Sequence, residues 1–254
     1  MKYVLAISYD GTDFAGWQIQ KNGRTVQGVL EEAALEIFGK ETKIKGSGRT
    51  DSGVHAYFQV CEFEAETSIP AEKLRECFNR ILPPDVSVLK SAEAPLDFDC
   101  TRAARKKTYC YRAYFSEYPL PLSERYEARL PNKADTERMR KASKLLVGNH
   151  DFKAFSATGS SAKTSEREIY SVEISEREEQ NALHYEIKVC GNGFLYNMVR
   201  IIAGELFAVG FGKSEEAIKE ALQTGKRELL AKTMPAKGLA LLNTEYEANL
   251  FGDI

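Results

Sequence analysis

The sequence of 254 residues predicts an α+β protein made of two ferredoxin-like halves, each with elements in the order β-α-β-β-α-β. Two observations carry this prediction. Apolar residues recur at every second position in some segments, as in strands, and at every third or fourth position in others, as in helices. The same order of elements then occurs twice, although the two halves are not visibly alike in sequence. We therefore expect an N-terminal half at 1–104 and a C-terminal half at 105–254.

The first half begins with a strand at 2–10, which ends at the turn pair Asp-Gly. Thr25 is a suitable cap for a helix with one apolar face, and Gly39 is a suitable residue to end it. The remaining elements of this half are strands at 42–46 and 57–66, a helix that begins at Pro70, and a strand at 85–93.

The second half begins with a strand at 106–115 that is rich in aromatic residues. Asp135 is expected to cap a helix that Gly148 closes. The remaining elements are strands near 170–174 and 183–189, a long apolar helix from about 194 to 209, a short helix from Ser214, and a final strand at 238–246.

Composition limits the functions open to this chain. Its 35 Lys and Arg residues against 37 Asp and Glu residues give a net charge of −2, so nucleic-acid binding has to come from a local basic patch. Five scattered cysteines without a C-x-x-C pair disfavour a disulfide framework or a zinc site and indicate a reducing compartment. The N-terminal apolar run is too short for a signal peptide, and no segment has the length of a membrane span. We expect a soluble cytoplasmic protein.

The stretch "GSGRTDSGVHA" at 46–56 is the most unusual part of the sequence. A P-loop would need a lysine after Gly53, and Asp51 stands where a dinucleotide-binding loop has its third glycine. An aspartic protease needs a second Asp-Thr/Ser-Gly triplet, and the chain has none. Two interpretations remain: a glycine-rich turn in which Asp51 bonds its own backbone, or a loop that presents a reactive carboxylate. Arg49 and His55 favour the second, because cationic and hydrogen-bonding neighbours keep a carboxylate ionised.

Two further stretches carry candidate functional residues. Residues 102–112, "RAARKKTYCYR", form a basic run that turns into a strand with Tyr109 and Tyr111 on one face. This pattern is typical of a solvated surface with packed tyrosines, or of phosphate contacts leading to a base-stacking platform. Arg200 lies inside the apolar helix of the second half and needs a partner if it is buried. Asp51 is an attractive partner, and Glu205 on the same helix is the local alternative.

Together these stretches closely resemble the tRNA pseudouridine synthase A family. The resemblance is carried, in family order, by "YDGTDFAGWQ" (9–18), "TVQ" (25–27), "GSGRTDSGVHA" (46–56), "KKTYCYR" (106–112), "LVGNHDF" (146–152), "NGFLYNMVR" (192–200) and "PAKGLAL" (235–241). It implies the pseudouridine synthase fold, in which the antiparallel sheets of two halves join around a central catalytic cleft. It also implies a homodimer that shares one tRNA, and isomerisation of uridine to pseudouridine at positions 38 to 40 in the anticodon stem-loop, without metal or organic cofactor.

The resemblance assigns roles to individual residues. Asp51 matches the catalytic carboxylate, Tyr109 the tyrosine that stacks on the target base, and Arg200 the arginine that pairs with the catalytic aspartate. Leu239 and, more loosely, Phe194 match residues on the apolar side of the pocket.

The neighbours of the catalytic loop are assigned less sharply. Arg49 and His55 flank the carboxylate and either grip the RNA backbone or hold the loop. After Phe98 the family often has His-Ala-Arg, whose arginine enters the base stack when the uridine flips out. Here Thr101 stands in place of that arginine and Arg102 follows it. Either Arg102 takes the role after a local shift or another group does.

Three other functions remain to be weighed. The chain could be a synthase of the same family that acts on another tRNA or rRNA uridine. It could also be a non-catalytic RNA-binding protein, which would not need Asp51, but the aromatic RNP signature of such modules is absent from the sequence. A carboxylate-dependent hydrolase would need a second carboxylate folded close to Asp51.

Overall fold

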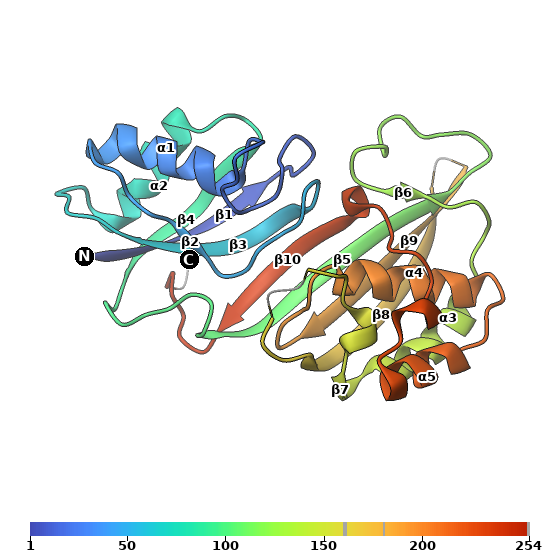
Figure 1. Cartoon of the computed structure of the whole chain (residues 1–254). Coiled ribbons are helices and arrows are strands. Elements are labelled where there is room, and N and C mark those ends of the chain that lie inside the picture. Colours follow the sequence, from blue (N-terminus) through green and yellow to red (C-terminus); the bar gives the residue numbers. More distant parts are fainter. Residues whose placement is uncertain (160–161, 180, 253–254) are drawn as a thin grey trace. The chain divides into compact units, whose positions relative to one another are not determined.

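The computed structural model describes residues 1–159, 162–179 and 181–252, and the chain divides into two compact units (Figure 1). Unit 1 consists of Met1–Lys106 and Leu241–Ile254, and unit 2 of Lys107–Ala240. The predicted α+β class is confirmed. The expected division lay between residues 104 and 105, whereas the observed one lies two residues later and places the C-terminal residues in unit 1.

Unit 1 is built on β1 (Lys2–Tyr9), which pairs antiparallel with β3 (His55–Glu64) on one side and with β4 (Val86–Ala94) on the other. β2 is short (Lys45–Gly46) and pairs with the outer side of β3, so only the last two residues of the expected strand at 42–46 are in the sheet. Helices α1 (Val26–Phe38) and α2 (Leu74–Ile81) lie on the same side of these strands in Figure 1. This is the predicted order β-α-β-β-α-β.

Both faces of β1 are covered, and this explains why the strand is apolar at nearly every position. On the helix side, aromatic rings of Tyr3, Phe38, Phe63 and Phe78 pack with centroid separations of 5.5 to 6.2 Å. A second cluster contains buried Val4, Val60, Ala94 and Cys100 with partly buried residues from the 92–98 and 246–251 segments.

The C-terminal residues belong to unit 1 because they complete this second cluster. The ring of Tyr246 packs 5.8 Å from the ring of Phe98, and its hydroxyl donates to the carbonyl oxygen of Cys100 at 2.9 Å. Phe251 makes an edge contact with Phe58 at 6.1 Å. Contacts between residues so far apart, 146 positions for Tyr246 and Cys100, leave no periodic pattern, and this segment was therefore expected in the second half.

Unit 2 contains an antiparallel sheet in the order β5 (Ala104–Phe115), β9 (Ala182–Gly191), β8 (Glu166–Glu179) and β7 (Gly148–Asp151). The short β6 (Ala128–Arg129) pairs parallel with β5, and β10 (Leu239–Tyr246) begins in unit 2 and ends in unit 1. Its helices are α3 (Thr136–Ser143), α4 (Met198–Gly210) and α5 (Glu216–Thr224). Short 3₁₀ turns occur at Ala71–Lys73, Lys144–Leu146, Lys153–Phe155, Arg227–Leu229 and Ala236–Gly238.

Some local signals for helix ends are confirmed, but the expectation that Gly148 closes the helix after Asp135 is wrong, because α3 ends at Ser143 and Gly148 begins β7. The Thr25 side chain accepts from the backbone N–H of Gly28, and Gly39 ends α1 at a φ of 66°. The Asp135 side chain accepts from two backbone N–H groups at the start of α3. The expected start of α4 near residue 194 is wrong by four residues, because Asn197 adopts a left-handed conformation (φ 62°) and holds the chain before it in a loop.

Candidate active site

Asp51 lies in unit 1 at the first position of a tight turn. The backbone N–H of Val54 donates to the Asp51 carbonyl oxygen at 3.1 Å, and Gly53 has a φ of 77°. Glycine takes this left-handed conformation at little cost, whereas a residue with a Cβ would be strained. The glycine of "DSG" therefore makes the turn, and the Asp51 side chain is half-buried at its entrance.

A buried hydrogen-bond network fixes the residues just before Asp51. The Tyr9 hydroxyl donates to Gln59 Oε1 at 2.6 Å and lies 2.8 Å from Thr50 Oγ1, so the Thr50 hydroxyl is the donor to Tyr9. Gln59 Nε2 in turn donates to the Gly48 carbonyl oxygen at 2.9 Å. Tyr9, Gln59 and Thr50 are 4%, 0% and 8% exposed, and buried polar groups satisfied in this way hold one geometry.

The 9–18 stretch supports the other side of the turn. The Phe14 carbonyl oxygen accepts from Ser52 Oγ and from the Gly53 backbone N–H, both at 3.2 Å. Gly16 has a φ of 102°, and a Cβ on it would lie 2.7 Å from the Thr50 carbonyl oxygen. The two sequence motifs, joined by contacts between residues 38 and 41 positions apart, therefore form one structural unit around Asp51.

His55 contacts the start of the 9–18 stretch. It is 6% exposed, its Nδ1 accepts from the backbone N–H of Gly11 at 3.0 Å, and the same atom lies 3.1 Å from Asp10 Oδ1. Of the two roles expected for His55, these contacts favour holding the loop. Arg49, in contrast, is exposed.

An ion pair between Arg24 and Asp85 packs against the 9–18 stretch. The guanidinium of Arg24 stacks 4.1 Å over the Phe14 ring and donates to both carboxylate oxygens of Asp85, at 2.5 and 2.8 Å. This hydrogen bonding raises the pKa of Arg24 and lowers that of Asp85. The Asp85 carbonyl oxygen also accepts from the Asp10 backbone N–H at 3.0 Å. Asp85 therefore links Arg24 to the start of the 9–18 stretch.

Tyr9 and Gln59 were missed by the sequence analysis as functional residues. Tyr9 opens a motif that was quoted only for the resemblance. Gln59 is a polar residue in the apolar strand β3 with a fully buried side chain, and a buried amide that hydrogen-bonds to a loop is a recognisable signal of loop support.

Replacing Tyr9 with phenylalanine is expected to lower both stability and activity. Thr50 and Gln59 each lose their partner in a buried site, which costs about 1–3 kcal/mol of unfolding free energy. Tyr185→Phe is the matched control, because it removes a buried tyrosine hydrogen bond, the one accepted from the Ala134 backbone N–H, in unit 2. Urea denaturation should show a loss in both variants, and steady-state kinetics should show a lower kcat in Tyr9→Phe alone. Equal kcat values for the two variants would contradict the loop-holding role.

Arg102 lies on a short segment that packs beside the start of the 46–56 stretch. Its backbone N–H and its Nε both donate to the carboxylate of Asp99, at 3.0 and 2.9 Å, and its side chain is 83% exposed. Lys45 Nζ lies 2.7 Å from the same carboxylate, and Thr101 Oγ1 donates to the Gly46 carbonyl oxygen at 3.2 Å. Burial opposes the ionised form of Asp99, but the bonds from Lys45 and Arg102 outweigh it and hold its pKa well below the usual range.

Tyr109 lies in unit 2, in the middle of β5 opposite Val189 of β9. It is 8% exposed, and its ring meets that of Phe194 edge to face, with centroids 5.2 Å apart and planes at 85°. On the same face of β5, Tyr111 is fully buried and its hydroxyl donates to the Pro235 carbonyl oxygen at 2.9 Å. Burial raises the pKa of Tyr111 strongly, against an opposing effect of the nearby Arg200 charge. The candidates Tyr109 and Phe194 are thus in direct contact.

Arg200 lies in the first turn of α4 and is half-buried. Its Nε donates to the Met234 carbonyl oxygen at 2.7 Å and its Nη1 to Asn197 Oδ1 at 2.6 Å. The local alternative for its charge partner, Glu205, is engaged elsewhere: Glu205 Oε2 lies 2.8 Å from Lys213 Nζ. The prediction that Arg200 pairs with Asp51 stays a prediction.

Leu239 is the first residue of β10 and is 6% exposed. It follows Gly238, on which a Cβ would lie 2.5 Å from the Arg112 carbonyl oxygen and 2.7 Å from Tyr111 Cζ. Glycine is therefore required for the chain to pass this close to β5. The "PAKGLAL" motif brings Leu239 into the same unit as Tyr109, Phe194 and Arg200.

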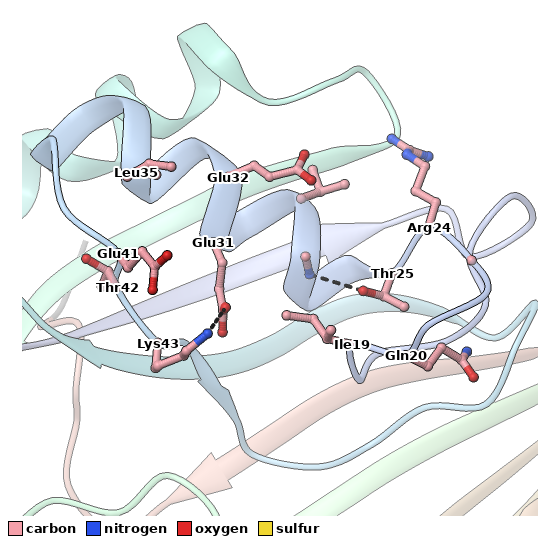
Figure 2. Close-up of a pocket in the computed structure, with 13 residues that line it drawn as sticks. Ile19, Gln20, Arg24, Thr25, Glu31, Glu32, Leu35, Glu41, Thr42 and Lys43 are labelled. Atoms are coloured by element: carbon pink, nitrogen blue, oxygen red, sulfur yellow. Dashed lines mark hydrogen bonds and ion pairs between the residues drawn. The ribbon is translucent and has the colours of Figure 1, made fainter.

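A surface pocket of about 520 Å³ lies along α1 in unit 1 (Figure 2). Its wall includes Glu31, Glu32 and Glu41, and Lys43 Nζ, 3.2 Å from Glu31 Oε2, is already paired. None of the predicted site residues lines it. An acidic wall repels phosphate, so this pocket is not suited to hold an RNA backbone.

Two features are absent from the part of the chain that the structure describes. No group of three or more His, Cys, Asp or Glu side chains in residues 1–159, 162–179 and 181–252 is arranged to hold a metal ion. In the same part of the chain, no helix has the length and apolar character needed to cross a membrane.

Comparison with known proteins agrees with the motifs. Residues 5–101 and 142–247 match the model of a family described as tRNA pseudouridine synthase. Proteins named tRNA pseudouridine synthase A are 44% identical in Citrifermentans bemidjiense, over 96% of both chains, and 41% identical in Acetivibrio thermocellus, over 95% of this chain and 98% of the relative. A chain in the crystal structure of a Cbf5–Nop10–Gar1 complex aligns with 94% of this chain and 58% of its own length, at 11% identity and a TM-score of 0.33.

The matches to the two named relatives cover nearly the whole of each chain. Together with the α+β architecture, they define an RNA-modifying isomerase that acts on tRNA. The chain belongs to the tRNA pseudouridine synthase family, and the resemblance found in the sequence is confirmed.

Proposed function

We propose that this enzyme isomerises uridine to pseudouridine at positions 38 to 40 in the anticodon stem-loop of tRNA, with Asp51 as its catalytic carboxylate. The observation that carries the proposal is the built support of the Asp51 turn, in which Tyr9, Phe14 and Gln59 bond the residues on either side of the carboxylate. A satisfied buried network of this kind holds a loop in one geometry, as the positioning of a reactive carboxylate requires. The full-length similarity to proteins named tRNA pseudouridine synthase A supports the same conclusion.

The chemistry suits a single carboxylate. In the reaction the bond between N1 of uracil and C1′ of ribose breaks, and a bond between C5 and C1′ forms. One proton leaves C5 and one is taken up at N1, so the overall change is an isomerisation and needs no redox or group-transfer cofactor. The carboxylate of Asp51 either attacks the sugar carbon or removes a neighbouring proton to give a glycal.

The base has to leave the RNA stack and be held flat. Extraction costs a few kcal/mol, and stacking on an aromatic ring returns about 1–3 kcal/mol per base. We assign this stacking to Tyr109, whose ring orientation is supported by the edge contact with Phe194. Leu239 supplies apolar surface that excludes water, and an ion pair with Arg200 keeps Asp51 charged in such surroundings.

The remaining assignments concern the RNA and the assembly. Arg49 is exposed and suited to contact phosphate, whereas His55 acts by holding the loop. Arg102 is the candidate for the residue that replaces the flipped base, since it is exposed beside Gly46. The protein acts in the cytoplasm as a homodimer that shares one tRNA.

Release of tritium from a tRNA transcript labelled at uridine C5 tests the proposed reaction. The purified protein should release label from the transcript without added metal or cofactor, and carbodiimide mapping should place the product at positions 38 to 40. Label release with product at another position would support the alternative of a synthase with a different target uridine. Binding of tRNA without any release would favour the non-catalytic alternative.

Replacing Tyr109 with phenylalanine is expected to leave tRNA affinity within about threefold of the wild type, because the stacking face is kept. Tyr109→Ala should weaken binding or kcat/KM by about 10-fold or more, the equivalent of 1–3 kcal/mol of lost stacking. Filter binding and single-turnover kinetics measure both effects. Tyr170→Phe, on an exposed tyrosine of β8, is the control. A large loss in Tyr109→Phe would mean that the hydroxyl matters more than the ring.

A further inference from the structure

The 229–238 segment of unit 2 runs along α4 and is hydrogen-bonded at its first end, near Leu229, and again in its middle, at Met234. At the first end Lys213 Nζ donates to the Leu229 carbonyl oxygen at 2.7 Å, and the Ala231 backbone N–H donates to Glu205 Oε2 at 2.6 Å. At Met234, Arg200 Nε donates to the Met234 carbonyl oxygen at 2.7 Å, and the Met234 backbone N–H donates to the Arg200 carbonyl oxygen at 3.3 Å.

Glu205 is a fully buried carboxylate beside the Leu229 end of the segment. It is 0% exposed, and its Oε2 takes both the Ala231 N–H and Lys213 Nζ, the latter at 2.8 Å. Its Oε1 has no hydrogen-bond partner among the residues that the structure describes. A buried ion pair is a poor source of stability compared with apolar packing. The contribution of Glu205 is therefore to fix geometry. Its carboxylate holds the Ala231 N–H and Lys213, and Lys213 in turn donates to the Leu229 carbonyl oxygen.

Gly204, the residue before Glu205, sets how closely the segment approaches the helix. A Cβ on Gly204 would lie 2.3 Å from the Lys232 carbonyl oxygen and 3.5 Å from Met234 Cγ. Glycine in the middle of a helix is unfavourable, so its presence here reflects this close passage.

The segment also carries the groups that orient the candidate site. The Met234 carbonyl oxygen receives Arg200 Nε, the Pro235 carbonyl oxygen receives the Tyr111 hydroxyl at 2.9 Å, and Leu239 follows directly. A shift of the segment along α4 moves the Met234 acceptor and with it the guanidinium of Arg200.

We propose that Glu205 and Gly204 are positioning residues for the isomerisation: they fix the 229–238 segment on α4 and, through the Met234 carbonyl, the direction of the Arg200 guanidinium. This inference rests on the role of Arg200 in the proposed function. Neither residue touches the substrate. Their contribution is to hold Arg200 in one orientation, and misplacement of a catalytic group by about 1 Å costs up to about 100-fold in rate.

The test uses Glu205→Gln, which keeps the size of the side chain and removes its charge. We expect kcat for tritium release to fall about 10- to 100-fold with KM and the tRNA dissociation constant within about threefold of the wild type. Lys213→Arg keeps the cation and should stay within about threefold. Gly204→Ala should reproduce the loss. Amide hydrogen exchange should rise in peptides that cover the 229–238 segment.

Two controls separate positioning from loss of stability. Ile174→Ala, on β8, removes buried apolar contacts of the same unit away from the segment and should lower the Tm without changing kcat well below that Tm. In an Arg200→Lys background the effect of Glu205→Gln should shrink, because both changes act on one guanidinium. A kcat for Glu205→Gln equal to that of Ile174→Ala, or full additivity with Arg200→Lys, would overturn the inference. Absence of label release by the wild type would instead contradict the proposed function, and unchanged exchange in the 229–238 segment would then still overturn the positioning role.

Discussion

Asp51→Asn is expected to abolish the isomerisation while tRNA binding persists. The amide is nearly the same size as the carboxylate, and hydrogen bonds from backbone groups and from Thr50 and Ser52 help to hold the turn, so we expect the loop to keep its conformation. An amide cannot attack a sugar carbon or accept a proton from it at neutral pH. Loss of a residue that enters the chemistry directly lowers kcat by about 1,000-fold or more.

The measurement is single-turnover release of tritium from uridine C5, together with filter binding of the same transcript. Asp13→Asn is the matched control, because it makes the same chemical change on an exposed aspartate of the neighbouring 9–18 stretch. Its kcat should stay within about twofold of the wild type. Label release by Asp51→Asn within tenfold of the wild type would remove Asp51 from the mechanism.

Arg200→Gln is the second change with a large expected effect. Glutamine can still donate to one of the two acceptors, Met234 O or Asn197 Oδ1, but it carries no charge. If Arg200 stabilises the catalytic carboxylate in a water-poor site, kcat should fall by about 100-fold or more, the size of effect seen when one electrostatic contact at a reacting group is removed.

A double-mutant cycle on stability tests the pairing of Arg200 with Asp51. Unfolding free energies of Arg200→Gln, Asp51→Asn and the double variant should give a coupling of about 0.5–3 kcal/mol. Arg102→Gln combined with Asp51→Asn is the control cycle, because Arg102 is bound to Asp99. A coupling no larger than in this control would show that Arg200 acts without pairing to Asp51.

The helix ends show where sequence reasoning succeeds. Thr25, Gly39 and Asp135 act on backbone groups within four residues of themselves, so their effects are local and readable. The start of α4 was placed too early because the apolar residues Phe194 and Leu195 precede the helix, whereas the left-handed Asn197 delays its start to Met198. Strand 42–46 was too long for a similar reason, since Thr42 and Ile44 are buried outside the sheet.

The sequence alone was sufficient for the family and for the list of candidate residues, because the motifs "GRTDSGVHA", "KKTYCYR" and "PAKGLAL" carry identity and order without reference to contacts. The tertiary structure decided how those motifs are held. Tyr9 and Gln59 bond the residues around Asp51, Glu205 turns away from Arg200 toward Lys213 and Ala231, and the C-terminal residues pack with unit 1. The physical reason is that a hydrogen bond or a packed ring selects its partner by position in space, and partners as far apart in the chain as Phe58 and Phe251 leave no periodic trace in the sequence.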